Sequence, residues 1–113
     1  MTFSNADLER LGDTALQEFT ARLREEVRIS GSPAHTSAER LEAKLEQLYG
    51  IAVTLAQREE TVSEVAAVWS GMVRVCDRIA KTLSAELNGE SLKSYDRILD
   101  IRNACEENRA LHA

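Results

Sequence analysis

The sequence predicts an all-α protein that folds as an antiparallel helical bundle. Apolar residues recur at steps of three and four over most of the chain, which is the period of an amphipathic helix. The chain has one proline and five glycines, whereas Ala, Leu, Glu and Arg, which favour helix, are plentiful. Its 113 residues have the size of one domain, so we expect residues 1–113 to form a single bundle.

The first helix is expected at about 5–29. Ser4 followed by Asp7 has the pattern of a capping box, in which two side chains satisfy free N–H groups at a helix start. Glu18, Arg22 and Glu26 lie four residues apart and off the apolar stripe, so we expect them to pair along the solvent face. A glycine and a proline follow the helix and predict its end.

Two further helices are expected at 37–58 and 62–88. Thr36 and Thr61 each begin a capping-box pattern, with a glutamate three residues later. Behind each pattern, leucine, valine and alanine recur at steps of three and four, as on the buried face of a bundle helix.

The apolar repeat runs in phase from Leu41 to Leu87 and is interrupted only at Glu59. We favour four helices, because a bend near Glu59 makes the second and third helices match the first in length. The alternative is three helices with one long central helix at 37–88, because no glycine or proline marks the bend and an unbroken helix preserves the phase.

A fourth helix is expected at about 91–110, after Asn88-Gly89, a pair that commonly ends helices. Its apolar face includes Cys105, and Cys76 lies on the apolar face of the third helix. The two cysteines are far apart in the sequence and match no metal or redox spacing. We therefore expect both to be reduced thiols in the core.

Charge and hydropathy exclude several classes of function. The net charge is −5 and no Lys/Arg-rich run is present, which disfavours nucleic-acid binding. No apolar run approaches the roughly 20 residues of a membrane span, so we expect no membrane partner. The N-terminus has no pattern of a secretory signal, so we expect a cytoplasmic location.

Residues that bind metals or catalyse reactions do not form a recognisable set. His35 and His112 lack the Glu-x-x-His spacing of metal sites in helical bundles, and no glycine-rich phosphate loop is present. We therefore expect no cofactor and no catalytic activity. The alternative is a metal-dependent, nucleotide-processing helical enzyme with an acidic site between helices, formed by Glu59, Glu60, Glu64, Asp96 and Asp100.

Trp69-Ser70-Gly71 resembles the W-x-G tripeptide of small secreted helical-hairpin proteins. In that family the tripeptide lies at the bend between two helices, whereas here Trp69 falls within the apolar repeat. We therefore expect a core tryptophan next to a glycine that admits close helix packing.

A surface on the third helix is the predicted partner-binding site. Arg74, Arg78 and Lys81 form a basic stripe next to the core line, as in coiled coils that select their partners by charge. Val65, Val68 and Met72 belong to a second apolar flank, which is wider than the stripe of about 100° that one core absorbs. We therefore expect a protein-interaction module, an adaptor or small helical chaperone, that forms a homodimer.

Overall fold

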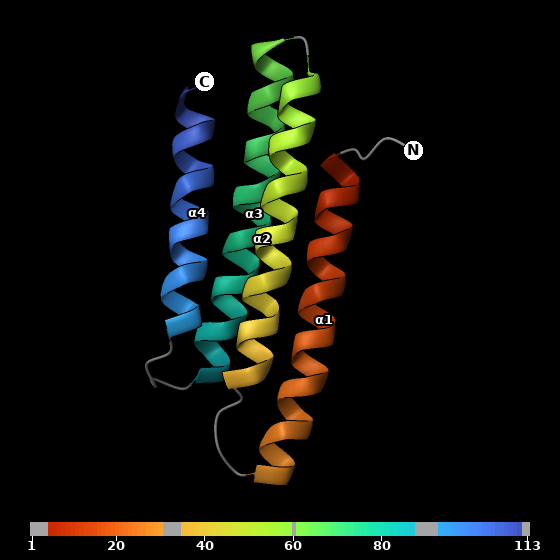
Figure 1. Ribbon diagram of the computed structural model, residues 1–113, viewed down its shortest axis with the longest axis vertical. Helices are drawn as coiled ribbons and strands as arrows, with labels where there is room; N and C mark the ends of the chain where they lie inside the picture. Colours follow the sequence, from red (N-terminus) through yellow and green to blue (C-terminus); the bar gives the residue numbers. More distant parts are fainter. Residues whose placement is uncertain (1–4, 31–34, 60, 88–92, 112–113) are drawn as a thin grey trace.

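A computed structural model describes residues 5–30, 35–59, 61–87 and 93–111, apart from a few side chains within these ranges. They form four helices: α1 (Asn5–Ser30), α2 (His35–Arg58), α3 (Val62–Leu87) and α4 (Lys93–Leu111). Figure 1 shows that successive helices run in opposite directions along the long axis. The all-α bundle of four helices is therefore confirmed, and each helix end lies within two residues of its predicted position.

The chain breaks between α2 and α3, so the alternative of one long helix at 37–88 is wrong. Thr61 caps α3: its Oγ1 accepts a hydrogen bond from the backbone N–H of Glu64 at 3.1 Å. Its carbonyl oxygen accepts another from the N–H of Val65, also at 3.1 Å. A cap of this kind allows a helix to begin without a nearby glycine or proline.

The other predicted helix boundaries have different outcomes. Helix α2 begins at His35, so Thr36 lies in its first turn and not at the capping position. Ser4 and the Asn88-Gly89 pair lie outside the described residues.

Helices α2 and α3 form the centre of the bundle. Each of them contacts the other three helices, whereas α1 and α4 make no contact with each other within the described residues. Figure 1 shows α1 and α4 on opposite sides of the α2–α3 pair. The Cα atoms accordingly span 50 × 28 × 16 Å, a flattened bundle that is two helices thick at its centre.

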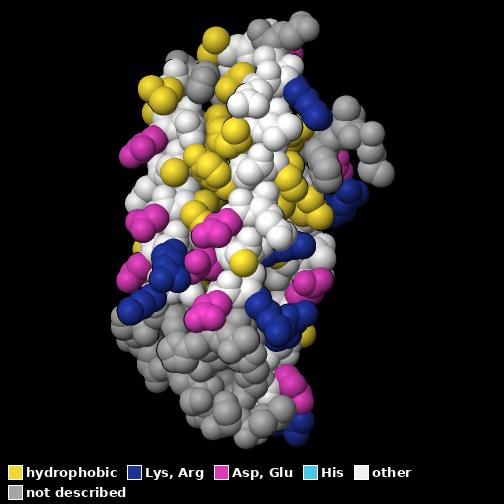
Figure 2. Space-filling view, in the orientation of Figure 1, with side chains coloured by type: hydrophobic (Ala, Val, Ile, Leu, Met, Phe, Trp, Pro, Cys, Tyr) yellow, Lys and Arg dark blue, Asp and Glu magenta, His cyan; other side chains and the backbone are white. Residues whose placement is uncertain are grey.

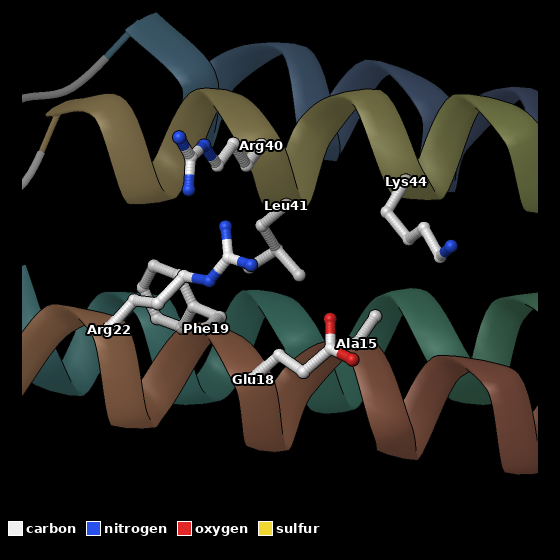
Figure 3. A pocket seen from close by; sticks show the side chains of 7 residues that line it. All are labelled: Ala15, Glu18, Phe19, Arg22, Arg40, Leu41 and Lys44. Carbon is white, nitrogen blue, oxygen red and sulfur yellow. The ribbon is translucent and has the colours of Figure 1, made fainter.

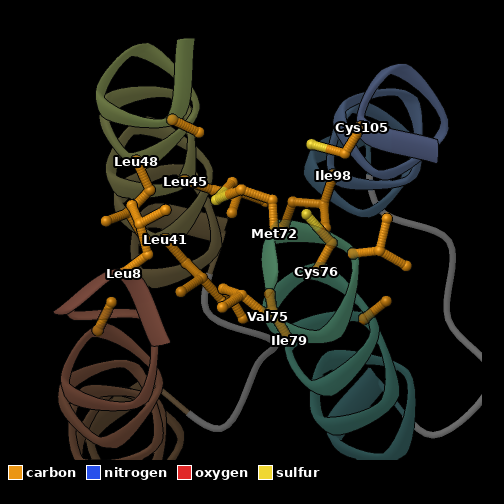
Figure 4. Packing of buried hydrophobic residues seen from close by; sticks show 14 of the residues in the cluster. Leu8, Leu41, Leu45, Leu48, Met72, Val75, Cys76, Ile79, Ile98 and Cys105 are labelled. Carbon is orange, nitrogen blue, oxygen red and sulfur yellow. The ribbon is translucent and has the colours of Figure 1, made fainter. Parts of the chain in front are cut away.

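Side chains from all four helices meet in one apolar core (Figure 4). Trp69 is buried within α3, as predicted, and its ring lies 5.5 Å from that of Tyr49 on α2. The largest fully buried side chains are Leu8, Leu45, Leu48, Val68, Met72, Val75, Cys76, Ile79, Leu83, Ile98 and Cys105.

Within the described bundle, α1 approaches α3 so closely at Gly12 that a glycine is needed there. A Cβ atom added to Gly12 would lie 2.5 Å from Cγ1 of Val75, which is far inside normal contact. A Cβ on Gly71 would meet only the end of the Arg74 side chain, at 3.7 Å. The prediction that Gly71 admits close helix packing is therefore wrong, and Gly12 has that role.

None of the described helices combines the length and the apolar character that crossing a membrane requires.

Candidate functional site

The predicted partner-binding residues on α3 divide into an apolar and a basic group. In the apolar group, Met72 and Val68 are 0% and 1% exposed, so the expectation that they face a partner is wrong. Val65 is half-buried and packs against the same core. These side chains pack in or against the core of the chain itself.

The second apolar flank is buried because α3 occupies the centre of the bundle. Helices α1, α2 and α4 all pack on α3, so a much wider sector of it is covered than in a helix with two neighbours. Among the described residues, only Val62 and Leu111 are large hydrophobic side chains with high exposure. The homodimer stays a prediction, but most of the apolar area from which it was inferred lies inside one chain.

The basic stripe on α3 is largely neutralised by α1. The guanidinium Nε of Arg74 lies 2.7 Å from Oε1 of Glu9, and that of Arg78 lies 3.2 Å from Oδ1 of Asp13. Both pairs join parallel helices at matching steps of four residues. Lys81 is exposed and forms no ion pair with a described residue. Two of the three predicted cations thus tie α1 to α3.

Among the described residues, the carboxylates considered for a metal site lie at opposite ends of the bundle. Arg102 of α4 pairs with Asp77 of α3 at 2.9 Å, which aligns Asp96 with the region of α3 near residue 83. Glu64 is therefore roughly 30 Å away along the axis, at about 1.5 Å per residue. Within the described residues, which omit Glu60, no three His, Cys, Asp or Glu side chains converge.

A groove with an apolar floor and a charged rim lies between α1 and α2 (Figure 3). Its volume is about 190 Å³. The floor is apolar and consists of the buried side chains of Ala15, Phe19 and Leu41. The rim is charged and exposed, with Glu18 and Arg22 on α1 and Arg40 and Lys44 on α2.

The rim of this groove is positive on a chain whose net charge is −5. Three cations and one carboxylate line it, which leaves a local charge of +2. Unlike Arg74 and Arg78, the cations Arg22, Arg40 and Lys44 form no ion pair or side-chain hydrogen bond with a described residue. The predicted pairing of Glu18 with Arg22 is likewise not formed.

A second groove, between α1 and α3, has a different character. It is open, with a volume of about 470 Å³, and its lining is mostly small and polar. Its two charged residues are Asp13, which already pairs with Arg78, and Arg24. Figure 2, in the orientation of Figure 1, shows apolar side chains gathered in the upper and middle part of this face, with most of the charged ones towards its lower part.

The two cysteines, 29 positions apart in the sequence, both lie between α3 and α4 (Figure 4). Cys76 and Cys105 are both 0% exposed and both free thiols, as predicted. A hydrogen bond between them, together with burial, raises the pKa of the Cys76 thiol. The same hydrogen bond lowers the pKa of Cys105, although burial acts in the opposite direction.

Sequence reasoning missed both the charged groove and the thiol pair. A weak signal for the groove exists, because Arg40 and Lys44 lie one turn apart beside the apolar stripe of α2. No local signal shows that Arg22 of α1 lies opposite them, since this depends on the register between two helices.

Comparison with protein-family models, with curated proteins and with solved structures finds no match to this chain.

Proposed function

We propose that the protein is a protein-interaction module, an adaptor or small helical chaperone, and that the α1–α2 groove binds an acidic segment of its partner. The observation that carries this proposal is the group of cations Arg22, Arg40 and Lys44, which form no ion pair with a described carboxylate and which surround an apolar floor. The segment that complements it has one large apolar side chain flanked by Asp or Glu.

The size of the groove favours a side chain over a small metabolite. Pockets for small molecules usually measure about 300–1,000 Å³. At about 190 Å³ this groove is smaller, and it is open on one side. It accommodates one anchoring side chain, while the rim contacts the neighbouring acidic residues of the same segment.

The energies predict weak binding by the groove alone. Burying one large apolar side chain contributes about 1.5–3 kcal/mol. Each exposed ion pair on the rim contributes about 0.2–1 kcal/mol. The sum is close to the roughly 4 kcal/mol of a millimolar complex, before the cost of association. A physiological partner must therefore contact additional surface, and the groove supplies selectivity for acidic sequences.

Nuclear magnetic resonance titration tests this proposal with a short synthetic peptide in which one Phe is flanked by Glu and Asp. We expect chemical-shift changes centred on Phe19 and Leu41. Binding should become weaker as salt is added, because salt screens exposed charges. The double variant Arg40→Glu/Lys44→Glu should lose most of the binding. The matched control Lys81→Glu removes an exposed cation outside the groove and should bind like the wild type.

Two outcomes contradict the proposal. One is equal binding by the groove double variant and by Lys81→Glu. The other is a shift pattern centred away from the groove. Replacing the Phe of the peptide by Ser removes the apolar anchor and keeps the acidic residues. An unchanged affinity would then show that the apolar floor of the groove does not contribute to binding.

A further inference from the structure

Cys76 and Cys105 are placed together by the register of α4 on α3. The ion pair between Arg102 and Asp77, at 2.9 Å, fixes this antiparallel register. Cys105 lies three residues after Arg102 and Cys76 lies one residue before Asp77, so both thiols fall at the same level of the interface. Figure 4 shows both side chains between α3 and α4 in the apolar core.

The second observation is that α4 is held by few buried side chains. Only Ser94, Ile98 and Cys105 of its residues are buried, whereas α2 and α3 contribute most of the core. Helix α4 packs on α2 and α3 and has no contact with α1 within the described residues. An outer helix with few fully buried side chains can open locally without unfolding of the whole bundle.

We propose that Cys76 and Cys105 are a redox-sensitive pair, and that their oxidation to a disulfide locks α4 onto α3. Both thiols lie at the same level of the α3–α4 interface, so the bond forms without a large rearrangement of the two helices. Both are fully buried, so an oxidant reaches them only when α4 opens. After oxidation this opening is suppressed, because a covalent bond then joins the two helices at mid-length.

The oxidant in this step is a low-molecular-weight disulfide. The Cys105 thiol loses its proton to water, and its sulfur attacks the small disulfide, which releases one small thiolate. Cys76 then loses its proton and attacks the Cys105 sulfur of the mixed disulfide, which releases the second small thiolate. The cysteine pair loses two electrons and two protons, and the small disulfide is reduced to two thiols.

Mass spectrometry of the reduced full-length chain, treated with oxidised glutathione in native buffer and then alkylated, tests the proposal. We expect a monomer that has lost two hydrogens and offers no thiol for alkylation, with unchanged helicity by circular dichroism. Hydrogen exchange of the α4 amides should slow by about tenfold or more after oxidation, while α1 exchanges as before.

The variants Cys76→Ala and Cys105→Ala are the controls, because a single thiol cannot form the internal bond. Each should stop at a glutathione adduct, which shows that the oxidant reaches the interface. For the wild type, a stable glutathione adduct, a disulfide-linked dimer or the absence of reaction would overturn the proposal. So would an internal disulfide that leaves the hydrogen exchange of α4 unchanged, a measurement that does not depend on how well the variants fold.

Discussion

Replacing Gly12 by alanine tests the contact between α1 and α3 most directly. The added Cβ would lie 2.5 Å from Cγ1 of Val75, whereas carbon atoms in contact lie about 3.5–4.0 Å apart. The neighbouring atom belongs to a β-branched side chain, which has little rotamer freedom in a helix. The two helices must therefore move apart, and the ion pairs of Glu9 with Arg74 and of Asp13 with Arg78 lie beside this contact.

The magnitude follows from two opposing effects. Alanine favours helix over glycine by about 1 kcal/mol. Overpacking of a well-packed interface costs about 1–3 kcal/mol. We expect the strain to exceed the gain, because the contact is so short, and the free energy of unfolding to fall by about 1–2 kcal/mol. For a domain of this size, the melting temperature should fall by roughly 4 °C or more.

Urea unfolding followed by circular dichroism measures this change, and Gly50→Ala is the matched control. No atom lies within 4 Å of a Cβ added to Gly50 in the exposed part of α2, so this variant should gain up to about 1 kcal/mol. Adding Val75→Ala to Gly12→Ala should make the double variant more stable than the sum of the two single changes predicts. Equal stabilisation by Gly12→Ala and Gly50→Ala would refute the close approach of α1 to α3.

Met72→Glu should abolish cooperative unfolding or lower the free energy of unfolding by about 3 kcal/mol or more, because it places a carboxylate in the core. A variant that is stably folded in circular dichroism and urea unfolding would show that Met72 faces solvent or a partner. Thr61→Ala should lower the free energy of unfolding by about 1 kcal/mol through loss of the α3 cap. The control Thr54→Ala removes only a hydroxyl that is hydrogen-bonded within α2, so it should change that free energy by less than about 0.5 kcal/mol in the same assay. In a double-mutant cycle, the exposed ion pair of Arg74 with Glu9 should contribute about 0.2–1 kcal/mol to stability in low salt and less in high salt. A larger contribution that persists in high salt would contradict a solvent-screened pair.

The helices could be predicted from the sequence because their signals are local. The polar segment around Glu59 and the cap at Thr61 lie within a few residues of each other, and together they favour the break between α2 and α3 over one long helix. The apolar faces likewise follow from spacing within one helix. Boundaries therefore agree with the structure to within two residues.

The arrangement of the helices could not be predicted in the same way. The width of an apolar stripe shows how much surface must be covered, but not whether the cover comes from the same chain. For this reason the sequence places Met72 and Val68 against a partner, whereas the central position of α3 buries them. The opposition of Arg22 to Arg40, and that of Cys76 to Cys105, depends equally on the register between helices.

The lack of contact between α1 and α4 makes the described bundle two overlapping three-helix units that share α2 and α3. Binding in the α1–α2 groove and oxidation at the α3–α4 interface therefore act on different units. Energetic effects at separated sites usually add to within about 0.3–0.5 kcal/mol. Any larger cooperativity between groove binding and cysteine oxidation must pass through α2 and α3, which both units share. A shift of α2 against α3 would change the ring contact between Tyr49 and Trp69. Tryptophan fluorescence, from the single Trp of the chain, thus reports on communication between the two outer helices.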